Sequence, residues 1–270
     1  MRREFLRRLL TLLLFVYASF AVTLAQGGDA ADGTAMVAYR TENEIVVAAD
    51  SKVTRGTFYV EPICKIRQFG NIFVTAGGLY RWPAGNFDLW EILSKAALGG
   101  AGLSDIVKRF ETFVELPLKN TVKAIKNQEP NLYQEKLLGK PSIAVLFFGI
   151  EDNVLTLKYR VFYVHPKVDD VLFSVDIKAG DCPGSLCPAG KGVVFFKRDE
   201  VDNQKIEEMF SNPFVSGDPK CDVVDLARKF VQMMIDKNAI NYGPPIDILS
   251  ITKDGAKWIQ KKEECPEIKK

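Results

Sequence analysis

The grouping of helical segments between blocks of strand-like segments is the feature that most constrains how this chain can fold. Residues 86–98 and 103–128 carry apolar side chains at three- and four-residue spacing, which predicts two consecutive amphipathic helices. Strand-like apolar runs lie before these helices at 34–39, 44–50, 65–69 and 72–78, and after them at 141–150, 153–164, 171–179 and 192–196. A third helix is predicted over 222–238, followed by closing strands over 246–252 and 257–259.

This order predicts an α+β fold, because alternating βαβ units would place a helix between successive strands. The polar residues 41–43 and the Gly70-Asn71 dipeptide separate neighbouring runs, which indicates antiparallel hairpins. The run at 141–150 is apolar on both faces, so both faces need cover. We therefore expect two stacked, mostly antiparallel sheets flanked by helices, a four-layer αββα sandwich formed as a single domain by residues 34–270.

The predicted helix over 103–128 also indicates which face it buries. Ile106, Phe110, Phe113, Val114 and Leu118 fall on one apolar stripe. We expect this stripe to pack against a sheet.

The first 33 residues differ from the rest of the chain. Residues 1–8 are basic, residues 9–25 form an apolar run that is short for a membrane span, and small residues precede Gln26. We expect residues 1–25 to be a signal peptide and residues 26–33 a short propeptide or linker, so that the protein is exported, periplasmic or secreted. The stretch RREFLR also resembles a twin-arginine export signal. The alternative is a membrane anchor formed by residues 9–25.

The cysteines fit an oxidising compartment. Cys182 and Cys187 lie in a stretch rich in Pro and Gly, and we expect them to form a disulfide. Cys64, Cys221 and Cys265 then leave one unpaired thiol. A single Cys-x4-Cys pair supplies only two ligands and the chain has one histidine, so we predict no metal site.

Charge and motifs exclude further classes of function. The formal net charge is only +2 and the lysines are scattered, so no surface for nucleic acid is predicted. The sequence contains no phosphate-binding or dinucleotide-binding glycine motif, and we predict no cofactor.

The single histidine limits the available catalytic chemistry. A serine–histidine–aspartate triad would depend on His165, which precedes a proline at a predicted strand end, where a solvated turn residue is the simpler interpretation. An N-terminal nucleophile needs no histidine. If the Gly33–Thr34 bond is cut, the freed α-amine of Thr34 has an ordinary pKa of about 8 and can accept the proton of the Thr34 hydroxyl. Such a site also needs a cation, a carboxylate that orients this cation and a backbone N–H for the oxyanion.

Several stretches, taken in order, match a known family. Thr34 follows a glycine, AADS ends the second predicted strand, and KI and TAGG follow in the next pair of strands. In these stretches, and in the closing stretch 243–260, the chain resembles the proteasome β-subunit type of N-terminal-nucleophile hydrolase and its bacterial relatives. The resemblance is good over residues 33–80 and fair over 243–260, and between them only the order of elements agrees.

The resemblance implies a role for each matching residue. Thr34 would be the nucleophile, Asp50 the orienting carboxylate and Lys65 the cation, if the loop before Lys65 is one residue shorter than usual. The N–H of Gly77 would form the oxyanion hole. The resemblance also implies autocatalytic cleavage after Gly33 and hydrolysis of peptide bonds or small amides. Assembly into a homo-oligomeric ring is implied by the family alone.

Some positions depart from the family pattern. Lys191 stands where a serine usually donates to the threonine amine. Asn238 and either Asn241 or Tyr242 take the place of an Asp-x-x-Ser pair before the closing strand. These departures leave open a catalytically inactive, exported binding or assembly module in which the bond before Thr34 stays intact.

Taken one at a time, the matching residues also have ordinary structural interpretations. Thr34 is a strand residue, Asp50 a turn residue and Lys65 a solvated lysine at a sheet edge. Gly77 shapes a turn.

Overall fold

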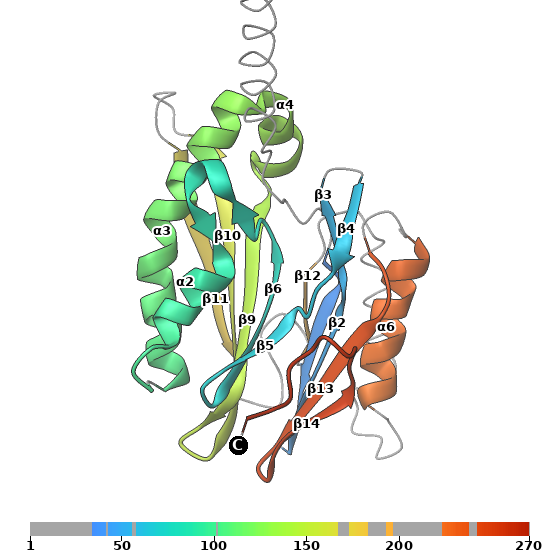
Figure 1. Ribbon diagram of the computed structural model, residues 1–270. Coiled ribbons are helices and arrows are strands. Elements are labelled where there is room, and N and C mark those ends of the chain that lie inside the picture. Colours follow the sequence, from blue (N-terminus) through green and yellow to red (C-terminus); the bar gives the residue numbers. More distant parts are fainter. Residues whose placement is uncertain are drawn as a thin grey trace, which may run out of the picture.

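A computed structural model shows two five-stranded sheets stacked face to face between helices (Figure 1). The structure describes residues 34–41, 43–55, 58–100, 102–166, 173–182, 193–196, 223–237 and 242–269. The predictions for residues 1–33 lie outside these ranges. Within them, no helix combines the length and the apolar character that a membrane span requires.

Each sheet is antiparallel throughout. Across sheet I the strands are β12 (Val193–Phe196), β1 (Met36–Arg40), β2 (Glu44–Asp50), β13 (Ile246–Thr252) and β14 (Gly255–Gln260). Across sheet II they are β11 (Phe173–Cys182), β10 (Val154–Pro166), β9 (Pro141–Glu151), β6 (Ile72–Gly78) and β5 (Ile66–Phe69). The predicted hairpins are present, since β1 pairs with β2 and β5 pairs with β6.

Helices cover the outer face of each sheet (Figure 1). Helices α2 (Leu89–Ala97) and α3 (Leu103–Gln128) lie over sheet II, and helix α6 (Val223–Lys237) lies over sheet I. One apolar cluster of the described residues fills each interface: helices against sheet II, sheet against sheet, and α6 against sheet I. The predicted four-layer αββα sandwich is confirmed.

Short elements connect these layers. They are β3 (Lys52–Arg55), β4 (Phe58–Pro62), β7 (Arg81–Trp82), η1 (Pro83–Gly85), β8 (Phe87–Asp88), α4 (Pro130–Leu132) and the π-helical turn η2 (Tyr133–Leu137). Strands β3 and β4 form a hairpin of their own, which the sequence did not predict.

Strand β2 shows why the central strands are apolar on both faces. The side chains of Ile45, Val47 and Ala49 belong to the cluster between the two sheets. Those of Val46 and Ala48 belong to the cluster under α6. Because successive side chains of a strand point to opposite faces, a strand in an inner layer of a four-layer fold needs apolar residues at every position.

Helix α3 confirms the predicted boundaries and most of the predicted stripe. Ile106, Phe110, Val114 and Leu118 are buried against sheet II. The prediction is wrong for Phe113, whose side chain is 43% exposed. The buried face also includes Val107 and Ile125, so it is centred away from Phe113, which lies at its edge.

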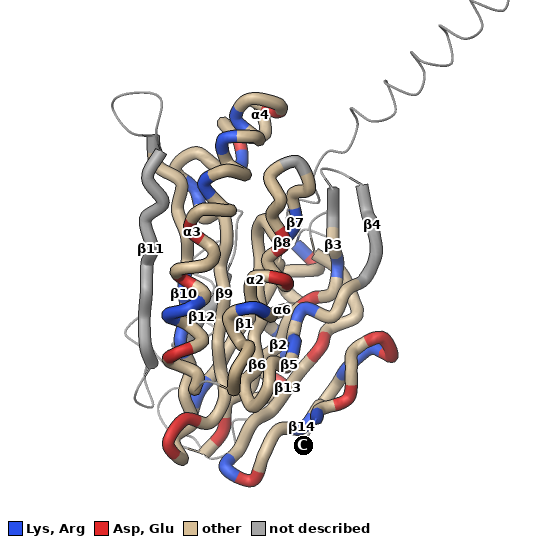
Figure 2. The backbone as a smooth tube through the Cα atoms, turned by 60° about the vertical axis from the view of Figure 1, so that its left-hand side comes forward, with Lys and Arg blue, Asp and Glu red and all other residues tan. Residues whose placement is uncertain are grey.

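Charged residues gather at the turns, on the helices and in the C-terminal segment (Figure 2). The buried charged side chains of the described residues are therefore exceptions, and they are Arg40, Asp50, Lys65, Asp247 and Lys262. All but Arg40 lie together at one end of the sandwich, linked by the contacts described below. Burying a charge is costly unless it is paired, so this concentration marks the candidate site.

Candidate active site

The candidate site forms where four strand ends meet. Residue 34 precedes β1, Asp50 ends β2, and antiparallel pairing places Met36 opposite Ala49 and Ile246 opposite Asp50. Lys65 lies directly before β5, the edge strand of sheet II. The sandwich therefore brings the start of β1, the end of β2 and the starts of β5 and β13 to the same place.

Thr34 is held against Asp50 by the backbone. The Ala35 N–H donates to Asp50 Oδ1 at 2.9 Å, and the Asp50 N–H donates to the Ala35 carbonyl, also at 2.9 Å. The side chain of Thr34 is buried. These two hydrogen bonds hold Ala35, the residue after the candidate nucleophile Thr34, against the candidate carboxylate Asp50.

Lys65 contacts both partners that the resemblance assigns to it. Its Nζ lies 2.8 Å from Asp50 Oδ1 and donates to Thr34 Oγ1 at 3.2 Å. The side chain of Lys65 is only 2% exposed and that of Asp50 is fully buried. Lys65 is therefore not a solvated edge lysine, and Asp50 ends strand β2 with its side chain buried.

The second oxygen of Asp50 is also satisfied. Asp50 Oδ2 accepts hydrogen bonds from the N–H groups of Lys52 and Gly243, each at 3.2 Å. The Gly243 contact was not predicted, because nothing in the local pattern of residues 243–245 connects them with Asp50. Because both of its oxygens accept hydrogen bonds, the Asp50 carboxylate has a fixed orientation.

Burial and pairing act in opposite directions on this ion pair. Burial raises the pKa of the Asp50 carboxyl, and Lys65 and the N–H groups of Gly243 and Ala35 oppose that rise. Burial lowers the pKa of the Lys65 ammonium, and the charges of Asp50 and then Asp247 oppose that fall. Each charge therefore depends on its partner, and a lysine with a lowered pKa lies beside the Thr34 hydroxyl.

Gly77 lies at the same end of sheet II. Strand β5 starts at Ile66, opposite Thr75, so Gly77 is beyond the last β5–β6 residue pair. It is on the same face of β6 as Thr75, whose Oγ1 lies 3.8 Å from Met36 Sδ of sheet I. This position faces the start of β1, and the role of the Gly77 N–H as an oxyanion donor stays a prediction.

The neighbouring Gly78 has a structural requirement of its own. Its φ is +91°, and a Cβ atom there would lie 2.2 Å from the Ser142 carbonyl oxygen. Only glycine fits such a position. The Gly-Gly pair therefore carries at least one residue that is fixed by packing.

Of the other residues that the resemblance singles out, the structure describes only Tyr242. Tyr242 is fully buried in the cluster under α6, which makes it part of the core. Gly33, Lys191, Asn238 and Asn241 lie outside the described residues. The cut bond and the altered supporting residues therefore stay predictions.

A second polar cluster adjoins the first and was missed by sequence reasoning. Asp247 of β13 accepts hydrogen bonds from Ser51 Oγ (3.1 Å) and the Lys262 N–H (3.1 Å), and its Oδ2 lies 3.2 Å from Lys262 Nζ. Ser51 follows Asp50 directly, so the two clusters are continuous along the chain. Asp247 is the one charged residue of strand β13, and that is the signal that could have found it.

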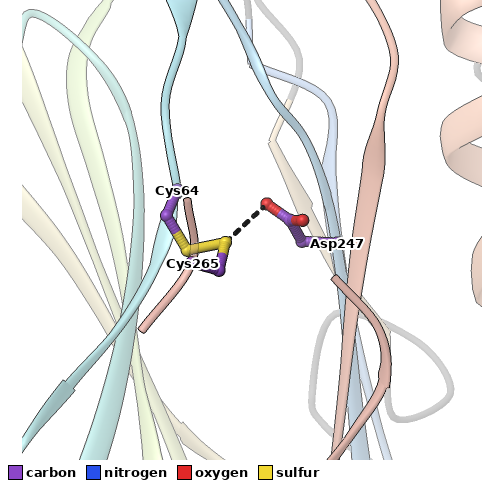
Figure 3. Close-up of side chains that lie close together, drawn as sticks. All are labelled: Cys64, Asp247 and Cys265. Carbon is purple, nitrogen blue, oxygen red and sulfur yellow. Dashed lines mark hydrogen bonds between the residues drawn. A yellow bond between two sulfur atoms is a disulfide. The ribbon is translucent and has the colours of Figure 1, made fainter. Parts of the chain in front are cut away.

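A disulfide closes this end of the sandwich. Cys64 and Cys265 are bonded, with their Cα atoms 5.2 Å apart, and Asp247 lies beside them (Figure 3). The expectation of a disulfide is thus met by a different pair, while Cys187 and the side chain of Cys182 lie outside the described residues. Local spacing favoured the short Cys-x4-Cys pair, and only the fold brings Cys64 and Cys265 together.

This arrangement does not suit a metal ion. Cys265 Sγ lies 3.4 Å from Asp247 Oδ2, so two sulfurs and a carboxylate are close together. The sulfurs are bonded to each other, however, and the Lys262 ammonium already neutralises the carboxylate. A cation would need two thiolates and the displacement of Lys262.

Residues 261–269 form hydrogen bonds with the segment around Lys65. Lys262 Nζ donates to the carbonyl of Ile63, two residues before Lys65. Further along, Gln68 and the backbone of Lys269 exchange two hydrogen bonds, at 2.8 and 2.7 Å. With the disulfide, these contacts hold the segment that leads into Lys65.

No protein-family model matches this chain, and a search of curated proteins finds no significant match. Function must therefore be argued from the geometry of Thr34, Asp50 and Lys65 and from the resemblance in their surrounding residues.

Proposed function

We propose that this protein is an exported threonine-type amide or peptide hydrolase, an N-terminal-nucleophile hydrolase of the proteasome β-subunit type. The observation that carries the proposal is the position of Lys65 Nζ, which is within hydrogen-bonding distance of both Thr34 Oγ1 and Asp50 Oδ1 in a buried site. The αββα sandwich supports it, because this is the architecture that the family resemblance implies.

The first step is attack on the substrate. Once the Gly33–Thr34 bond is cut, Thr34 Oγ attacks the amide carbonyl carbon and its proton passes to the free α-amine of Thr34. The Lys65 ammonium stabilises the developing charge on Oγ and lowers the pKa of the amine, while Asp50 keeps Lys65 in place. The N–H of Gly77 donates to the tetrahedral oxyanion.

The second step releases the products. The protonated amine gives its proton to the leaving nitrogen, the C–N bond breaks, and the acyl group remains on Thr34 Oγ as an ester. Water, deprotonated by the same amine, then attacks the ester and returns the hydroxyl to Thr34. Peptides and small amides are the proposed substrates, and ring assembly is proposed from the resemblance alone.

The mature N-terminus tests this proposal. We expect intact mass and Edman sequencing of active protein to give Thr34 as the first residue. Thr34→Ala should keep the segment that ends at Gly33 and hydrolyse none of a panel of fluorogenic peptide amides. Thr34→Ser is the matched control and should keep both processing and activity at a reduced rate.

One outcome would contradict the mechanism, and another would contradict only its autocatalytic cleavage. Active protein that starts at Gln26 or Met1 would refute it, because a blocked amine cannot accept the proton. Cleavage at the same bond in Thr34→Ala would show that another protease makes the cut, which removes the autocatalytic step.

The departures in the sequence favour one alternative. Lys191, Asn238 and Asn241 replace residues that support the threonine amine in the family, as expected of an inactive binding or assembly module. An intact Gly33–Thr34 bond in the isolated protein, together with no hydrolysis of the panel, would support this alternative.

A further inference from the structure

Asp247 is a buried carboxylate that the proposed mechanism does not use. It lies in β13, opposite Ala49 of β2 and therefore next to Asp50, and its side chain is fully buried. Leu249 and Ile251 lie two and four residues further along β13, on the same face as Asp247, and they belong to the cluster between the sheets. Asp247 thus faces the interior from the strand beside the candidate carboxylate.

The contacts of Asp247 join the two segments that carry the candidate ion pair. Ser51, which donates to Asp247 Oδ2 at 3.1 Å, follows Asp50. Lys262, whose N–H and Nζ both contact Asp247, also donates from Nζ to the Ile63 carbonyl before Lys65. One carboxylate is therefore linked to the segments on both sides of the Asp50–Lys65 pair.

The four buried charged side chains at this end of the sandwich are two carboxylates, Asp50 and Asp247, and two ammonium groups, those of Lys65 and Lys262. The charged groups that act on Lys65 come from β2 (Asp50), from β13 (Asp247) and from the segment after β14 (Lys262). Burial lowers the pKa of Lys65, and Asp247 opposes that effect after Asp50 does. Burial also lowers the pKa of Lys262, and Asp247 opposes this too, while the charge of Lys65 adds to it. Removing either Asp247 or Lys262 changes the charge that Lys65 experiences, with opposite sign.

We infer that Asp247 is a positioning residue for Lys65: through Ser51 and Lys262 it fixes the segments that carry Asp50 and Lys65, and it supplies a second negative charge that favours the protonated form of Lys65. Its role in catalysis rests on the proposed function. The role of its charge in setting the protonation of Lys65 can be measured in the folded protein without any substrate.

A purely structural role for Asp247 would have a different signature. Substitutions would then lower stability, and the pKa of Lys65 would not move in a direction set by the charge removed. An electrostatic role requires Asp247→Asn to lower the pKa of Lys65 and Lys262→Met to raise it. Each change is expected to be about one pH unit, at the low end of the range for a charge close to a buried titratable group.

The experiment is a titration of the full chain labelled with ¹³C at the lysine Cε, followed by NMR. The Lys65 resonance is assigned by its loss in Lys65→Arg. Wild type, Asp247→Asn, Lys262→Met and the double variant are compared, and the double variant should return the pKa of Lys65 towards the wild-type value. Asp254→Asn, which removes an exposed carboxylate at the far turn of β13, is the matched control and should leave it unchanged.

Shifts of the same sign in the two single variants, or no shift in either, would overturn the inference. If Asp247→Asn does not fold, the upward shift in Lys262→Met is the deciding measurement, because that variant keeps Asp247. An unchanged pKa of Lys65 in either folded single variant overturns the inference by itself.

A second arm separates this inference from the proposed function. With a fluorogenic peptide amide as substrate, the alkaline limb of the pH–rate profile should move to lower pH in Asp247→Asn and to higher pH in Lys262→Met. If the pKa of Lys65 moves as expected and no variant hydrolyses any substrate, the inference stands and the proposed function fails. If wild type is active and the pKa of Lys65 does not respond, the proposed function stands and the inference fails.

Discussion

The Cys64–Cys265 disulfide should contribute a large part of the stability of this fold. The bond closes a loop between residues 201 positions apart in the sequence. In the chain-entropy treatment, a loop of this length restricts the unfolded state by about 5 kcal/mol at 25 °C, and measured disulfide contributions are typically about 2–4 kcal/mol. Cys265→Ser should therefore lower the free energy of unfolding by at least about 2 kcal/mol.

Equilibrium unfolding in urea without reductant measures this loss. At an m-value of about 2–3 kcal/mol per molar, the midpoint should fall by about 1 M. Peptide mapping under non-reducing conditions must first show the Cys64–Cys265 link in the wild-type protein. Because Cys265→Ser leaves a free thiol at Cys64, the double variant Cys64→Ser/Cys265→Ser is the matched control, and it should unfold at the same midpoint as the single variant.

One result would refute this reasoning. A linked wild-type protein that unfolds at the same urea concentration as both variants would show that the loop is already restricted in the unfolded state. The disulfide would then add nothing measurable to the free energy of unfolding.

Two further predictions concern buried positions. Lys65→Met should abolish the proposed hydrolysis and lower the free energy of unfolding by about 3–5 kcal/mol, because it leaves the Asp50 carboxylate buried without its partner. Adding Asp50→Asn should recover part of the stability but none of the proposed activity. A Lys65→Met variant as stable as wild type would contradict the ion pair. Gly78→Ala should destabilise the protein by more than about 2 kcal/mol in urea unfolding, since its Cβ would meet the Ser142 carbonyl. Gly70→Ala, also at positive φ but with no atom within 4 Å of its Cβ, should lose only about 1 kcal/mol, so equal losses would contradict the packing argument.

The layered fold could be predicted because its signals are local. Helices over 86–98 and 103–128 follow from three- and four-residue spacing, and β9 follows from an apolar run on both faces. The hairpin of β3 and β4 was missed because Lys52–Arg55 is short and polar, without the alternation of a half-buried strand. Phe113 was wrongly predicted to be buried, because residue spacing does not determine whether a side chain at the edge of an apolar helix stripe is buried or exposed.

The candidate site could be predicted only in part. The proximity of Thr34, Asp50 and Lys65 was expected from the family resemblance, since no local pattern connects Lys65 with the other two. The contribution of Gly243 comes from a backbone N–H, which leaves no trace in side-chain chemistry. The disulfide depends on the folded path of the chain, which brings together residues that are far apart in sequence.

Residues 261–269 contact Ile63 and Cys64, which directly precede Lys65, and these contacts can form only late in the synthesis of the chain. Thr34 and Asp50 are synthesised early, but the Ile63 carbonyl gains its donor from Lys262 only when that late part of the chain exists. An incomplete chain therefore lacks the groups that hold the cluster together. If the protein is exported unfolded from its N-terminus, as proposed, the contacts of residues 261–269 would form only after that segment had crossed, and this delay would postpone cleavage of the bond before Thr34.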